Sequence, residues 1–207
     1  DAYKGWAVKG MIHALCGEDA QMRYAFKNLQ QLRGGKLDPA QIAAEDRMHF
    51  CSIAAQLFAD LASPSSGFFA TNFENAFYLA SFPTLEKMLL EAEKMNLDIS
   101  NIDPVLITST KEITRIFAED NFSETEAQAM LDEAGAVLRD AKILGTQLNI
   151  EIDEETFDAP RVIYSIGVPF DGEKTADLRF NLAERIAENI KRIPSCFYVT
   201  FQPMSCQ

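Results

Sequence analysis

Four cysteines and two histidines are the residues of this chain with the most obvious chemistry. Cys16 stands three residues after His13, and Cys51 stands two residues after His49. Two histidines and two cysteines are enough to hold a structural zinc ion. The second pair argues against zinc, because positions 49 and 51 of one helix point about 200° apart. A hydrogen-bonded core histidine is the better interpretation of His49.

A disulfide interpretation fits the cysteines better than a metal site. If the first three helices run up, down and up, Cys16 lies about 20 Å along the first, and Cys51 lies about 18 Å along the third. We therefore expect a Cys16–Cys51 bridge, which leaves Cys196 to pair with Cys206. Two disulfides, with an N-terminus that lacks methionine, predict an extracytoplasmic protein, secreted or periplasmic. The alternative is four reduced, mostly buried cysteines in a cytosolic domain.

Motifs for other chemistries are missing from the sequence. It contains no G-x-S-x-G nucleophile elbow, no Walker A loop and no G-x-G-x-x-G turn. A hydrolytic triad would have to use His13 or His49, and both fall within predicted helices. We therefore predict no cofactor and no metal, and we favour a protein without catalytic activity. An enzyme with unrecognised carboxylate or metal chemistry is the alternative.

The charge balance limits the partners. The chain has 31 Asp and Glu against 19 Lys and Arg, and its net charge is -12. This balance argues against a nucleic-acid-binding face, and no run reaches the roughly 18 apolar residues of a membrane span. A basic protein partner is compatible with the charge, although solubility alone also explains it. The candidate contact is the acidic run "EIDEETFD", and its candidate residues are Asp153, Glu154, Glu155 and Asp158.

Two further features could form a site. The segment after "SPSSG" is unusually aromatic, so it forms either a core plug or the rim of an apolar pocket or partner groove. Its candidate contact residues are Phe68, Phe69, Phe73, Phe77 and Tyr78. Arg179 projects into the apolar arc of the last predicted helix. There it either extends past the sheet edge with its charge in solvent or binds a carboxylate of the protein or of a ligand.

Most of the elements that must position these residues are helices. Apolar residues at helical spacing predict six or seven helices over residues 1–146. Asp38-Pro39 and Asp103-Pro104 are helix-start signals, and Ser123 with Glu126 forms a capping box. The third helix is expected to run without a break over residues 38–61. β-branched residues leave a strand over 105–108 as an alternative to helix there.

The period changes near residue 147. "LNIEI", "RVIYSIGV" and "CFYVTF" read as strands, with one more helix before the last of them. Residues 147–207 therefore form a β-β-α-β unit packed on the helical array of residues 1–146. The predicted fold is α+β, predominantly helical, in one compact domain.

Three functions follow from these features. The first is an extracytoplasmic acidic protein-binding module, such as an inhibitor, an immunity-type protein or an adaptor. The second is a carrier or sensor of a small apolar ligand, held in a pocket rich in Phe and Met. The third is an enzyme with unrecognised chemistry. An exposed apolar patch would favour the first, a pocket beside Phe73 and Phe77 the second, and clustered carboxylates of raised pKa the third.

Overall fold

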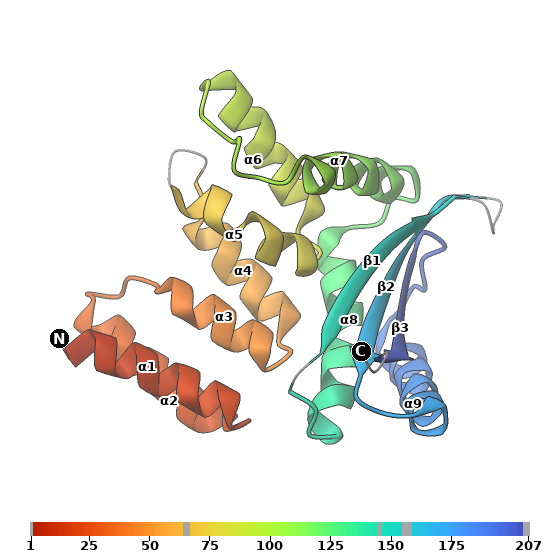
Figure 1. Cartoon of the computed structure of the whole chain (residues 1–207), viewed down its shortest axis with the longest axis horizontal. Helices are drawn as coiled ribbons and strands as arrows, with labels where there is room; N and C mark the ends of the chain where they lie inside the picture. Colours follow the sequence, from red (N-terminus) through yellow and green to blue (C-terminus); the bar gives the residue numbers. More distant parts are fainter. Residues whose placement is uncertain (1, 64–66, 145, 155–158, 205–207) are drawn as a thin grey trace.

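The computed structural model describes residues 2–63, 67–144, 146–154 and 159–204. Figure 1 shows helices through the first two thirds of the chain and a small sheet near its C-terminus. The elements are α1 Ala2–Leu15, α2 Asp19–Leu32, α3 Pro39–Arg47, α4 Cys51–Leu61, α5 Gly67–Tyr78, α6 Phe82–Lys94, α7 Pro104–Glu119, α8 Glu124–Asp140, β1 Gln147–Asp153, β2 Arg161–Val168, α9 Gly172–Asn189 and β3 Phe197–Pro203. The predicted helix-rich α+β fold is confirmed.

The sheet has the strand order β1-β2-β3. β1 and β2 are antiparallel neighbours, and β2 and β3 are parallel strands connected through α9. Tyr164 in the middle of β2 stands between Ile150 of β1 and Val199 of β3. The side chains of Tyr164 and Val199 are buried, so this row lies on the core face of the sheet.

The predicted helix starts are present. The carboxylates of Asp38 and Asp103 accept hydrogen bonds from the second residue of the helix that follows, at 3.0 and 2.8 Å. Ser123 and Glu126 form the predicted capping box at the start of α8. Val105–Thr108 belongs to α7, so the strand alternative is wrong there. Proline at the first helical position and a capping oxygen before it favour the helix despite the β-branched residues.

Seven of the described helices, all except α4 and α9, end in the same backbone motif. In α3, Phe50 N–H donates to Glu45 O at 2.9 Å and His49 N–H donates to Asp46 O at 2.8 Å. This is the Schellman pattern, and it requires a residue with positive φ. Glycine fills that position in two helices, and other residues fill it in five. The seven residues are Gly17, Gly34, His49, Ala80, Asn96, Asn121 and Lys142.

His49 therefore ends α3, and the uninterrupted helix predicted over residues 38–61 is wrong. Its φ is +58°, and a new helix begins at Cys51. Neither Gly nor Pro marks the break in the sequence. The contacts that hold the turn come from Arg139 of α8 and from Ile143 just after this helix, some 90 residues later in the chain.

The buried side chains form two hydrophobic cores. The larger one runs from Ile42 of α3 to β3 and contains Phe58, Phe82 and Phe117. The smaller one belongs to α1–α3 and contains Met22 and Phe26. Figure 1 shows α8 between α3 and α4 on one side and the sheet on the other. α8 thus stands where the unit with the smaller core meets the rest of the molecule.

Candidate functional site

The predicted Cys16–Cys51 disulfide is wrong. Both thiols are free; Cys16 is exposed and Cys51 is buried. The prediction depended on one helix over residues 38–61, but the break at His49 places Cys51 at the start of α4, in the larger core. Cys196 is also free, and its predicted partner Cys206 lies outside the described residues. The extracytoplasmic location thus loses its disulfide argument and stays a prediction.

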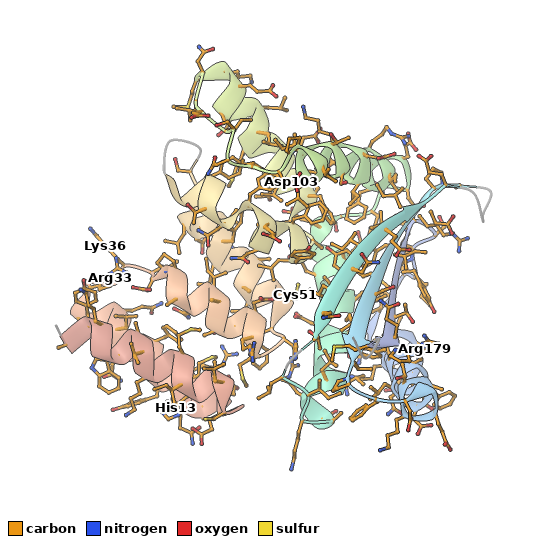
Figure 2. All side chains as sticks on the ribbon, in the orientation of Figure 1. His13, Arg33, Lys36, Cys51, Asp103 and Arg179 are labelled. Atoms are coloured by element: carbon orange, nitrogen blue, oxygen red, sulfur yellow. The ribbon has the colours of Figure 1, made fainter. Side chains whose placement is uncertain are left out.

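The histidines have hydrogen-bond partners within the protein. His13 Nδ1 bonds to the carboxylate of Glu18, and His49 Nε2 lies 3.0 Å from the carbonyl oxygen of Ile143. Burial lowers the pKa of His49, so its ring is neutral and can donate this bond. Figure 2 shows His13 on α1 at the outer edge of the molecule, and Cys51 near its centre. Within the described ranges, no group of three or more His, Cys, Asp or Glu side chains could hold a metal ion.

The aromatic segment lies mainly in the larger core. Phe69, Phe73 and Phe77 are buried, and the rings of Phe69 and Phe73 meet edge to face at 5.6 Å. These three rings are therefore not accessible to a partner. The side chain of Phe68 lies outside the described side chains. Tyr78 is half-buried and, among the candidates of this segment whose side chains are described, it alone lines the cleft discussed below.

Arg179 supports the edge of the sheet. Its Nε donates to the carbonyl oxygen of Phe201 in β3 at 2.6 Å, and Figure 2 shows it on α9 beside that strand. Among the strands of the described residues, β3 pairs with β2 alone. Val162 N–H bonds to Cys196 O across this parallel pair, so the carbonyl of Phe201, five residues on, points to the open side. Arg179 therefore satisfies a carbonyl of an edge strand.

The acidic candidates fall at the end of β1 and in the turn after it. Asp153 is half-buried and Glu154 is exposed. Burial, a hydrogen bond with Glu154 and the negative charge of Glu154 raise the pKa of Glu112 on α7. Glu155 and Asp158 lie outside the described residues. The contact of this segment with a basic partner stays a prediction.

A cleft of about 680 Å³ opens where the turn between α3 and α4, the helix α8 and one end of the sheet meet. Its size is in the usual range for small-molecule sites. Its walls combine leucines with charged and amide side chains. The lining residues are Asp46, Arg47, His49, Cys51, Tyr78, Leu131, Gly135, Leu138, Leu144, Thr146, Gln147, Leu148, Asn149, Ile166, Gly167, Gln202, Pro203 and Met204.

One face of α8 holds the α3–α4 turn in place. Gly135 allows the close approach, because a Cβ at this position would lie 2.2 Å from the carbonyl oxygen of His49. One turn later, Arg139 donates to the carbonyls of Met48, at 3.3 Å, and of His49. The guanidinium of Arg139 also lies 4.2 Å from the ring centre of Phe50. The wall of the cleft is therefore rigidly attached to α8.

The charged part of the lining is Asp46 and Arg47, the last two residues of α3. Within the part of the chain that the structure describes, neither side chain has a hydrogen bond or an ion pair. Asp46 contacts solvent in the cleft, but the surrounding protein raises its pKa to about 6, and the charge of Arg47 opposes this shift. The cleft therefore carries one carboxylate and one guanidinium, adjacent in sequence, at neutral pH.

The sheet contributes two amide side chains. Gln147, Gly167 and Gln202 are partners in register across β1, β2 and β3. Because Gly167 has no side chain, a notch lies between the two glutamines. Met204 closes the notch, since a Cβ on Gly167 would be 3.0 Å from its Cγ. Both amides line the cleft, and each can donate and accept hydrogen bonds.

The thiol in the cleft is not a nucleophile. Cys51 Sγ donates to Leu79 O at 3.6 Å, and burial raises the pKa of the thiol well above its ordinary value. Thiolate chemistry requires the opposite shift. The lining can therefore recognise charge and hydrogen-bonding groups. Sequence reasoning missed Asp46 and Arg47, because two charges at a helix end are the normal signature of a solvated surface.

No protein-family model, no curated protein and no solved structure matches this chain. None of the helices in the described ranges combines the length and the apolar character that crossing a membrane requires.

Proposed function

We propose that the protein binds a small zwitterionic molecule with an apolar body, of the size of an amino acid or a short peptide, in the cleft between α3, α8 and the sheet. The observation that carries the proposal is the pair Asp46 and Arg47. Both line the cleft, and among the described residues neither side chain forms a hydrogen bond or an ion pair.

The two charges set the polar requirements. An ammonium group is the complement of the Asp46 carboxylate, and a carboxylate is the complement of the Arg47 guanidinium, which can bind it with two hydrogen bonds. A ligand with both charges therefore matches this wall better than a simple cation or anion does.

The remaining lining sets the body of the ligand. Leu131, Leu138 and Leu148 supply apolar surface, and Gln147 and Gln202 supply hydrogen bonds at the sheet end. A peptide group fits this mixture, since it offers one N–H and one C=O to the amides. The expected ligand is thus more polar than the apolar molecule expected from the sequence, and it binds away from the buried rings of Phe73 and Phe77.

The experiment uses the dipeptide leucyl-leucine as a probe, together with its N-acetylated and its C-amidated forms. We expect the zwitterion to raise the melting temperature of the full chain with increasing concentration, since a ligand of the folded state stabilises it. Each blocked form should raise it less, because one of the two charge contacts is lost. Titration calorimetry then gives the affinities.

Two variants connect the effect to the cleft. Asp46→Asn should remove the preference for a free amino group, and Arg47→Gln should remove the preference for a free carboxylate. Arg115→Gln on α7 is the control, since this exposed arginine pairs with Glu119 and does not line the cleft. Equal responses to the zwitterion and both blocked forms would contradict the proposal, and so would unchanged responses in both cleft variants.

A further inference from the structure

A second pocket lies between α9 and the open edge of β3. We call it the α9 pocket. Its volume is about 320 Å³, and among the described residues it shares no lining residue with the cleft. Its walls are mainly apolar, and they include Met130 of α8, Leu182 and Ile186 of α9, and Phe197 and Val199 of β3. This volume is at the lower end of the range for small-molecule sites.

Arg179 brings a guanidinium to the α9 pocket. Its Nε donates to the carbonyl oxygen of Phe201 at 2.6 Å. Within the described ranges, its guanidinium has no other hydrogen bond and no ion pair, so the donors of both Nη groups stay available. The described lining contains no acidic residue. The pocket thus combines apolar walls with a positive charge.

The acidic residues of the neighbouring elements stand beside other arginines or on the far side of α9. Asp120 pairs with Arg192 at 3.5 Å. Asp153 is the register partner of Arg161, the second arginine of the lining. Around the axis of α9, three acidic residues lie about 140–180° from Arg179. These residues are Asp177, Glu184 and Glu188. Arg179 is therefore the charge that a ligand can neutralise.

The edge of β3 adds a backbone donor. Cys196 O accepts from Val162 N–H of β2 at 2.8 Å. Because alternate residues of a strand turn their backbone groups to opposite sides, the N–H of Val199 points to the open side. None of the described residues accepts a hydrogen bond from this N–H, and Val199 lines the pocket. A backbone N–H of this kind is a good donor to an anion.

The geometry points to a carboxylate with a short hydrocarbon tail as the ligand of the α9 pocket. The two carboxylate oxygens match the two Nη groups of Arg179, because arginine commonly binds carboxylates through two parallel hydrogen bonds. The tail packs against Leu182, Ile186 and Val199. At about 30 Å³ for each water-sized group, the pocket holds about ten non-hydrogen atoms, which is the size of octanoate.

Titration calorimetry of the full chain with octanoate is the first test. We expect one saturable site per chain. 1-Octanol and acetate should bind at least about tenfold more weakly, or 1.4 kcal/mol, because the alcohol lacks the charge and acetate lacks the tail. The net charge of -12 disfavours nonspecific binding of an anion. Equal affinities for octanoate and 1-octanol overturn the proposal, and so does the absence of octanoate binding.

Variants connect the binding to the pocket. Arg179→Gln removes the charge but keeps a donor for the carbonyl of Phe201, and it should weaken octanoate binding at least about tenfold. Ile193→Glu should also weaken it, because it places a negative charge in the lining. Phe180→Glu is the matched control, since Phe180 and Ile193 are both 65% exposed and Phe180 does not line the pocket. Unchanged binding in Arg179→Gln and Ile193→Glu, or an equal loss in the control, overturns the proposal.

Amide chemical shifts of the unmodified chain locate the bound molecule, so this measurement does not depend on the folding of a variant. Octanoate should shift the amide signals of Val199 and Thr200, which line the α9 pocket, and leave those of Asn149 and Gly167 in the cleft unchanged. Shifts confined to the cleft overturn the proposal. The outcome is separate from that of the leucyl-leucine experiment, because the two sites have different linings.

Discussion

Asp132 of α8 caps helix α4 through Ser52, 80 residues earlier in the chain. One carboxylate oxygen accepts from Ser52 N–H at 3.1 Å, and the other accepts from the Ser52 hydroxyl. α4 has no capping side chain at its own N-cap, which is Phe50. α6 is capped in the same way by Glu124, whose carboxylate accepts from Thr84 N–H at 3.2 Å. Two helices thus receive their caps from α8.

We predict that Asp132→Ala lowers the free energy of unfolding by about 1–2 kcal/mol, the cost of losing a helix cap. Asp132→Asn should cost less, because its amide oxygen can still accept from Ser52 N–H. The measurement is urea denaturation. Asp140→Ala is the control on the same helix, since Asp140 is exposed and its pair with Arg185 spans 3.6 Å; it should change stability by less than about 0.5 kcal/mol. Equal losses at positions 132 and 140 would contradict the capping role.

Gly135→Ala should be destabilising by about 1–3 kcal/mol, because the added methyl would have to displace the backbone of the α3–α4 turn. Glycine to alanine is favourable in most helices. A loss of stability at position 135 would therefore indicate the close approach of α8 to the α3–α4 turn. Gly172→Ala serves as the comparison, since a Cβ there meets nothing within 4 Å. A Gly135→Ala protein as stable as the parent would show that α8 and the turn do not approach closely.

The Asp46 carboxyl predicts a pH dependence. Its pKa in the folded protein is about 6, above the ordinary value of 3.8, so the folded state binds this proton more tightly than the unfolded state. Its contribution to stability therefore falls as pH rises from about 4 to about 6. Asp46→Asn should match the parent near pH 4 and exceed it at pH 7.5. We expect a gain below about 1 kcal/mol, because the group contacts solvent.

Denaturant titrations of both proteins at the two pH values check this prediction. Asp177→Asn, at an exposed residue of α9, is the matched control. The same stability difference between Asp46→Asn and the parent at pH 4 and pH 7.5 would rule out the raised pKa.

The positive φ at the end of α8 predicts a stabilising substitution. Lys142 has φ +58° and is exposed, so its side chain contributes little that glycine would lose. Lys142→Gly should raise the free energy of unfolding by about 1 kcal/mol, because glycine has no Cβ penalty in this region. Lys142→Ala keeps the penalty and should give no such gain. Thermal and urea denaturation of the two variants measures this difference. An equal stability of Lys142→Gly and Lys142→Ala would contradict the prediction.

Thiol accessibility tests the corrected cysteine assignment. In a Cys206→Ser chain, Cys16 should react with a thiol reagent at once, whereas Cys51 and Cys196 should react only on unfolding. Both are buried; burial raises the pKa of Cys51 well above its ordinary value, and burial with a hydrogen bond to Asp120 raises that of Cys196 to about 12. A count below three thiols in the unfolded, unreduced protein would reveal a disulfide after all.

The sequence by itself determined the helix starts and the order of the elements. Asp38, Asp103 and Ser123 each cap a helix through contacts within three residues, and such local contacts can be read from neighbouring letters. The change of period after residue 147 likewise predicted the strands, because alternation reflects a sheet with one buried face. The net charge of -12 follows from the residue counts alone.

Tertiary structure alone decided the break at His49, the cleft and the exposure of three apolar residues of α1. The break depends on Gly135 and Arg139, which lie about 90 residues later, so no local signal marks it. Val8, Ile12 and Leu15 have the spacing of a buried face, and only the packing of Gly10 and Ala14 on the other side shows which face of α1 meets the protein. Helix caps and hydrophobic periodicity depend on residues a few positions apart, so they can be read from the sequence. Burial depends on which distant elements pack together. The break at His49, the cleft and the exposed face of α1 could therefore not be predicted from the sequence.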